Sequence, residues 1–143
     1  LYLHFGLCRS LQVATNALRF DALTSLTVVS APMNAPRGGA LFQLIHFPAL
    51  RALTCENVYA ATTAELMARA PLLASLDVSR CNGQGSAVAV LLERDAQGCF
   101  TCARLSALTV RAGDARLEIA RLRDARPGVA VCEFEQLRRV ADD

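Results

Sequence analysis

One apolar pattern, L-x-x-L-x-V with Cys in place of Val in one copy, recurs along this chain and limits its possible folds. The fullest copy, within residues 71–83, extends to L-x-x-L-x-V-x-x-C. Three other copies begin at Leu23, Leu50 and Leu105. The second apolar position gives the anchors Leu1, Leu26, Leu53, Leu76, Leu108 and Cys132. Their intervals are 25, 27, 23, 32 and 24 residues, and a period of about 20–29 residues is typical of a stacked repeat.

The segments between the copies predict one helix each. Apolar residues at helical spacing form three stripes: Leu7, Leu11, Ala14 and Leu18; Leu41, Leu44 and Ile45; Val88, Leu91 and Leu92. Residues 62–65, Thr-Thr-Ala-Glu, fit a capping box at a helix start, and Asp114 is placed to cap a later helix. Pro48, Pro71 and Pro127 are expected to end helices before the next strand, because proline lacks the N–H that a helix needs.

A strand, a turn and a helix of this length cannot bury an apolar face alone, so successive units are expected to stack. The prediction is an α/β solenoid of about six strand–turn–helix repeats, with a parallel sheet on the concave face and helices on the convex face. The whole chain, residues 1–143, is read as one solenoid segment. Because it opens at Leu1, in mid-repeat, we expect it to be part of a longer chain.

The segment LASLDVSRC, residues 73–81, resembles the cysteine-containing, ribonuclease-inhibitor-like subtype of leucine-rich repeats. Only this copy carries the final cysteine; the other copies place Gly6, Ala31, Val58 and Gly113 there. The resemblance implies a solenoid of the kind found in scaffolds and in the substrate-receiving arms of F-box proteins. It therefore implies protein partners.

The last copy allows two registers. Aligning Pro127 with Pro48 and Pro71 turns Val129, Cys132 and Phe134 toward the core, whereas simple alternation turns Val129 and Val131 inward. We favour the proline alignment, because it gives a 24-residue interval.

Residues that flank the inward strand positions are expected to face the concave surface, since strand side chains alternate between faces. One predicted track is Tyr2, Thr27, Thr54, Asp77 and Thr109; the other is His4, Val29, Glu56, Ser79 and Arg111. The alternative is that the threonines only suit exposed strand positions. The protein-binding candidates are Tyr2, His4, Thr54, Glu56, Asp77, Ser79, Thr109 and Arg111.

The 32-residue interval indicates an insertion around residues 94–105, which holds the C-x-x-C pair Cys99 and Cys102. Two thiolates at this spacing suit zinc, but no second pair or H-x-x-x-H supplies further ligands. In the repeat frame Cys102 aligns with Phe47 and Ala70, which are expected to point into the core. We therefore predict no metal, no cofactor and no catalytic residues.

Charge and hydropathy exclude other classes of function. All 15 basic residues are arginines, and the net charge of +2 is too small to predict nucleic-acid binding. No apolar run reaches the roughly 18 residues of a membrane helix. The six cysteines, without a secretion signal, favour free thiols in a reducing intracellular compartment such as the cytoplasm.

Together these features predict a protein that is not an enzyme: a protein-interaction module or a scaffold subunit of a larger complex. No small-molecule substrate is expected. The alternative is the substrate-recognition arm of a ubiquitin ligase, with its adaptor-binding part outside this segment.

Overall fold

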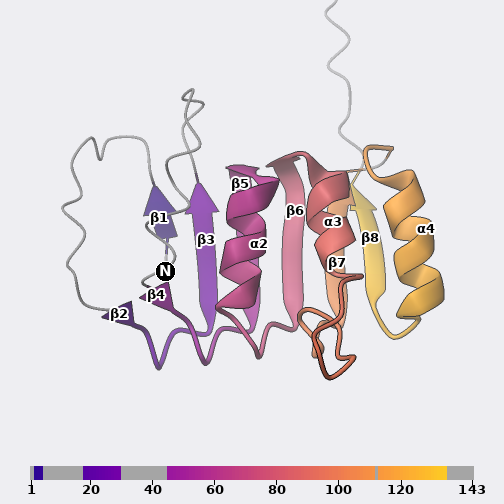
Figure 1. Cartoon of the computed structure of the whole chain (residues 1–143). Helices are drawn as coiled ribbons and strands as arrows, with labels where there is room; N and C mark the ends of the chain where they lie inside the picture. Colours follow the sequence, from indigo (N-terminus) through magenta and orange to yellow (C-terminus); the bar gives the residue numbers. More distant parts are fainter. Residues whose placement is uncertain (1, 5–17, 30–44, 112, 135–143) are drawn as a thin grey trace, which may run out of the picture.

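The computed structural model describes residues 2–4, 18–29, 45–111 and 113–134 (Figure 1). Six strands form one parallel sheet in chain order: β1 (Tyr2–His4), β3 (Ser25–Val29), β5 (Ala52–Tyr59), β6 (Ser75–Asn82), β7 (Ala107–Arg111) and β8 (Ala130–Phe134). Two short strands, β2 (Leu18–Arg19) and β4 (Ile45–His46), form a second parallel sheet. The protein is therefore α/β with a parallel sheet, as predicted.

Three helices cover one face of the large sheet. The helices α2 (Ala60–Ala68), α3 (Gln84–Val90) and α4 (Arg116–Ala125) follow β5, β6 and β7 respectively and pack side by side (Figure 1). Within the described residues no helix covers the opposite face, which we call the open face. None of the helices described is long and apolar enough to span a lipid bilayer.

The core lies between the strands and the helices. Alternate strand residues point into it, and Leu26, Leu53, Leu76 and Leu108 occupy matching positions in four adjacent strands, each 1% exposed. Burial of one such side chain stabilises the fold by roughly 1.5–3 kcal/mol. The recurring leucine pattern therefore marks the line along which the strands stack.

A four-residue turn precedes each of β5, β6, β7 and β8 at the same place in the fold. Backbone hydrogen bonds close these turns from Leu50 N to Phe47 O (3.2 Å), from Leu73 N to Ala70 O (3.1 Å), from Leu105 N to Cys102 O (2.9 Å) and from Val129 N to Arg126 O (3.0 Å). The corner position is thus held by Phe47, Ala70, Cys102 and Arg126, all of them buried. The prediction that Cys102 points into the core at this position is confirmed.

The favoured register of the last copy was wrong. Val131, not Cys132, pairs with Leu108, and Cys132 and Phe134 are exposed. Val129 is buried and Val131 packs against the core. The last turn reaches its strand one residue sooner than the others: Val129 precedes Val131 by two positions, whereas Leu105 precedes Leu108 by three. Aligning the prolines could not detect this missing residue.

Two predicted helix caps were also wrong. Helix α2 begins at Ala60, with Tyr59 at the N-cap, so Thr63 lies inside the helix and its Oγ1 donates to Tyr59 O (3.3 Å). Helix α4 has Ala115 at its N-cap and no side-chain cap. Asp114 pairs instead with Arg111.

The expected helical stripes fall differently on the structure. Leu7, Leu11, Ala14, Leu41 and Leu44 lie outside the described residues, as do Gly6 and Ala31. Leu18 and Ile45 belong to strands β2 and β4 rather than to helices. Val88 and Leu91 are buried at and just after the end of α3, as their spacing predicts.

Candidate functional site

The open face of the sheet carries three rows of residues in register. The first row holds small side chains: Ser25, Ala52, Ser75, Ala107 and Ala130. The second row, two positions further along each strand, is Tyr2, Thr27, Thr54, Asp77, Thr109 and Cys132. The third row lies at the carboxyl ends of the strands. It includes His4, Val29, Glu56 and Arg80, and then Arg111 and Phe134.

The second row is the first predicted track, now extended by Cys132. The strand register places Tyr2, Thr54, Asp77 and Thr109 on it. Thr54, Asp77 and Thr109 are half-buried, because each side chain is packed between those of the neighbouring strands. Their role in binding stays a prediction.

The third row differs from its predicted track at one residue. His4, Glu56 and Arg111 belong to it, but Ser79 does not, because β6 contains one extra residue between Asp77, which pairs with Thr54, and Arg80, which pairs with Glu56. This bulge buries Ser79 and brings Arg80 onto the open face. The strand β5 restores the register through Asn57, which has a positive φ of 55°.

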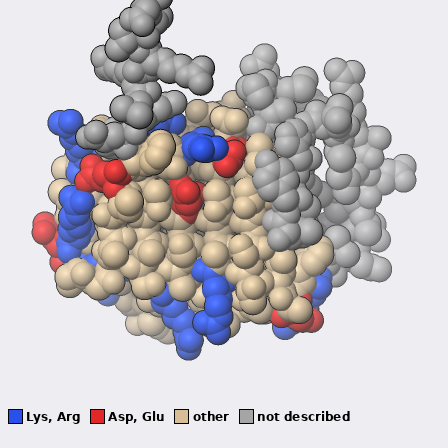
Figure 2. All heavy atoms as spheres, turned by 180° about the vertical axis from the view of Figure 1, so that it is seen from behind, with Lys and Arg blue, Asp and Glu red and all other residues tan. Residues whose placement is uncertain are grey.

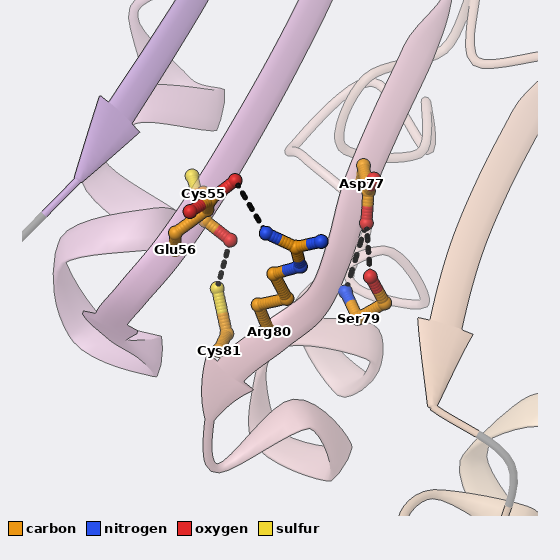
Figure 3. Close-up of polar contacts among 6 residues, drawn as sticks. All are labelled: Cys55, Glu56, Asp77, Ser79, Arg80 and Cys81. Atoms are coloured by element: carbon orange, nitrogen blue, oxygen red, sulfur yellow. Dashed lines mark hydrogen bonds and ion pairs between the residues drawn. The ribbon is translucent and has the colours of Figure 1, made fainter. Parts of the chain in front are cut away.

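The bulge is held by Asp77 (Figure 3). One carboxylate oxygen, Oδ1, accepts hydrogen bonds from Ser79 N (2.9 Å) and from Ser79 Oγ (2.7 Å). This arrangement satisfies a buried backbone N–H that the irregular strand would otherwise leave without a partner.

Two ion pairs involve arginines of the third row. Arg80 Nη1 lies 3.3 Å from Glu56 Oε1, and the Arg80 side chain is 66% exposed. Arg111 Nη1 lies 3.2 Å from Asp114 Oδ2. Such exposed pairs contribute roughly 0–1 kcal/mol, so they set the charge of the surface more than its stability. Viewed from this side, the molecule shows a mainly uncharged surface with few charged groups (Figure 2).

Gln84, at the start of α3, fills the space where β6 turns away from β7. Its Nε2 donates to Ser79 O (3.1 Å) and Cys81 O (3.4 Å), and its Oε1 accepts from Arg111 N (2.7 Å). The side chain is 2% exposed. Gln84 could not be predicted from the sequence, because a single glutamine has no spacing signal.

The insertion is the long connection between α3 and β7, residues 91–106. The corresponding connection between α2 and β6 is shorter and consists of residues 69–74. Arg94 and Phe100 form an antiparallel bridge within it, and the Arg94 guanidinium lies 3.8 Å from the centre of the Phe100 ring. Arg126 lies over the same ring at 5.1 Å. Burial lowers the pKa of Arg126, an effect that the nearby Cys102 opposes.

The cysteines within the described residues, which do not include Cys8, fall into a buried and an exposed group. Cys55, Cys81 and Cys102 are buried free thiols, whereas Cys99 and Cys132 are exposed. Cys81 Sγ donates to Cys55 O (3.1 Å; Figure 3). The hydrogen bond between the two thiols, together with burial, raises the pKa of Cys55. The same hydrogen bond lowers the pKa of Cys81, although burial acts in the opposite direction. Within the described ranges, no group of three His, Cys, Asp or Glu side chains could hold a metal ion.

Comparisons with models of protein families, with curated proteins and with solved structures found no match to this chain.

Proposed function

We propose that this protein is a non-catalytic protein-interaction module, built as a leucine-rich-repeat solenoid of about six units similar to the ribonuclease-inhibitor-like subtype. The parallel strands in chain order support this proposal, as does the helix that follows each of β5, β6 and β7 on the same face. The shared corner position of Phe47, Ala70, Cys102 and Arg126 supports a repeating unit as well.

The open face is the proposed binding surface. The observation that carries this proposal is the three-row register, which gives a floor of small and hydroxyl side chains bordered by larger ones at the carboxyl ends of the strands. A partner that lies across the strands contacts several units at once, which suits recognition of an extended protein surface.

The test is affinity capture of the protein from its source cells, followed by mass spectrometry of the companions. We compare the wild type with a double variant, Thr54→Arg and Thr109→Arg, which places two long charged side chains in the second row. A matched control carries Ala61→Arg and Ala120→Arg, at exposed positions on α2 and α4.

We expect the wild type and the helix-side control to retain the same stoichiometric companions and the second-row variant to lose them. Equal retention by both variants would contradict binding at the open face. Companions of the adaptor and cullin type would support the ubiquitin-ligase arm, which the resemblance alone suggests, and a fixed set of structural subunits would support a scaffold. An enzymatic activity abolished by one substitution in this chain would contradict the non-catalytic proposal.

A further inference from the structure

Asp77 is a half-buried residue near the centre of the open face. It occupies the second row on β6, between Thr54 of β5 and Thr109 of β7. The first-row residues beside it are Ala52, Ser75 and Ala107. These side chains are short, so a long side chain from a partner can reach the carboxylate over them.

The nearby arginines are engaged elsewhere. Arg80 forms its ion pair with Glu56, and Arg111 forms its pair with Asp114 while its Nε donates to Ser79 O (3.3 Å). Asp77 has no ion pair within the described residues, and both hydrogen bonds it accepts go to Oδ1. Two neutralised pairs therefore flank one uncompensated carboxylate, whose Oδ2 receives no donor from the described part of the chain.

From this charge arrangement we infer that the open face binds a basic segment of a protein partner, which places an arginine or lysine over Asp77. The inference rests on the proposed function and specifies its partner. A partner that covers a half-buried carboxylate without a cation leaves it desolvated and unpaired, which is unfavourable. A guanidinium or ammonium group instead forms charge-assisted hydrogen bonds with Oδ2. The Thr54 and Thr109 hydroxyls lie in register on either side and can hydrogen-bond the same segment.

The same arrangement argues against other ligands at this position. A single carboxylate is too few ligands for a metal ion, and it repels the phosphates of a nucleic acid. An acidic protein segment is disfavoured for the same reason. Asp77 thus attracts a basic segment and also disfavours partners that are acidic at this position.

The test uses a phage-displayed library of random peptides, selected on the wild-type protein. A second selection uses Asp77→Asn, which keeps an Oδ1 acceptor for Ser79 but removes the charge. The matched control is Asp124→Asn, an exposed acid on α4 that loses the same charge on the helix side. Circular dichroism checks that each variant is folded.

We expect peptides selected on the wild type and on Asp124→Asn to share an arginine or lysine at one position. Replacing it with glutamine is expected to weaken binding on the order of tenfold for the wild type, as one charge-assisted hydrogen bond contributes, and to have little effect for Asp77→Asn. In another outcome, the selected peptides fail to bind the double variant Thr54→Arg with Thr109→Arg and yet share no arginine or lysine. That result would overturn this inference and leave the proposed function standing. Peptides unaffected by that double variant would count against both.

Discussion

The buried position of Cys102 changes the ionisation of its thiol. The side chain is 7% exposed at the corner position, and its Sγ lies 3.8 Å from Met67 O. Burial raises the pKa of this thiol from its usual 9.0 to about 11, although the positive charge of Arg126 acts in the opposite direction. The folded protein therefore holds the Cys102 proton at pH values where the unfolded chain releases it.

This difference predicts a loss of stability in alkali. Above about pH 9 the unfolded state binds fewer protons at Cys102 than the folded state, so the free energy of unfolding falls as the pH rises toward about 11. Below pH 9 both states are protonated and the effect vanishes. Urea denaturation between pH 8 and 11 measures it, with Cys102→Ala as the control. A variant that loses stability with pH as steeply as the wild type would contradict the assignment to Cys102.

At the scale of elements, the insertion is attached to the last turn by one side chain. Arg126 Nη1 donates to Leu91 O (3.1 Å) and Thr101 O (2.9 Å), and Nη2 donates to Cys102 O (2.7 Å). These carbonyls lie at the two ends of the insertion, where the chain leaves and rejoins the regular fold. An apolar residue at this corner, like Phe47 or Ala70 in earlier turns, would remove the Arg126 donor from Leu91 O and Thr101 O and leave Cys102 O with Leu105 N alone.

We expect Arg126→Ala to lower the free energy of unfolding by about 2–4 kcal/mol, because hydrogen bonds to a charged group are lost and buried acceptors remain. Arg123→Ala is the matched control: it removes an exposed pair with Glu133 (2.9 Å) and is expected to cost less than about 1 kcal/mol. Urea denaturation gives both values, and limited proteolysis reports whether residues 91–106 open. Similar small losses in the two variants would show that Arg126 does not hold the insertion.

The sequence predicts those parts of the elements that obey a fixed period. The alignment of Leu53, Leu76 and Leu108 follows from the recurring pattern, and with it the second row of the open face. The position of the insertion follows from the long interval. Alternation with period two cannot detect a bulge. It therefore predicts Ser79 in the third row, where the structure has Arg80. Spacing alone also could not show that Arg126 replaces an apolar residue, because its partners are backbone carbonyls distant in sequence.

At the scale of the whole molecule, each described strand of the six-stranded sheet pairs only with its neighbours in the order β1, β3, β5, β6, β7 and β8. The sheet order equals the sequence order, and α2, α3 and α4 likewise pack against their neighbours in sequence. Stability in such an arrangement is close to a sum over units and the interfaces between them. A substitution in a central strand weakens two interfaces, whereas one in β8 affects a single described interface.

Two truncations of core side chains are therefore expected to change unfolding in different ways. Leu76→Ala, on β6 between β5 and β7, is expected to cost about 2–5 kcal/mol and to raise amide hydrogen exchange in all three strands. Val131→Ala, on β8 against β7 alone, removes a half-buried side chain, so its effect is expected to be smaller and confined to β7 and β8. Native-state hydrogen exchange resolves the two patterns. If amide hydrogen exchange accelerated uniformly along the chain in both variants, exchange would occur mainly through global unfolding rather than through local opening. The molecule would then unfold as one cooperative unit.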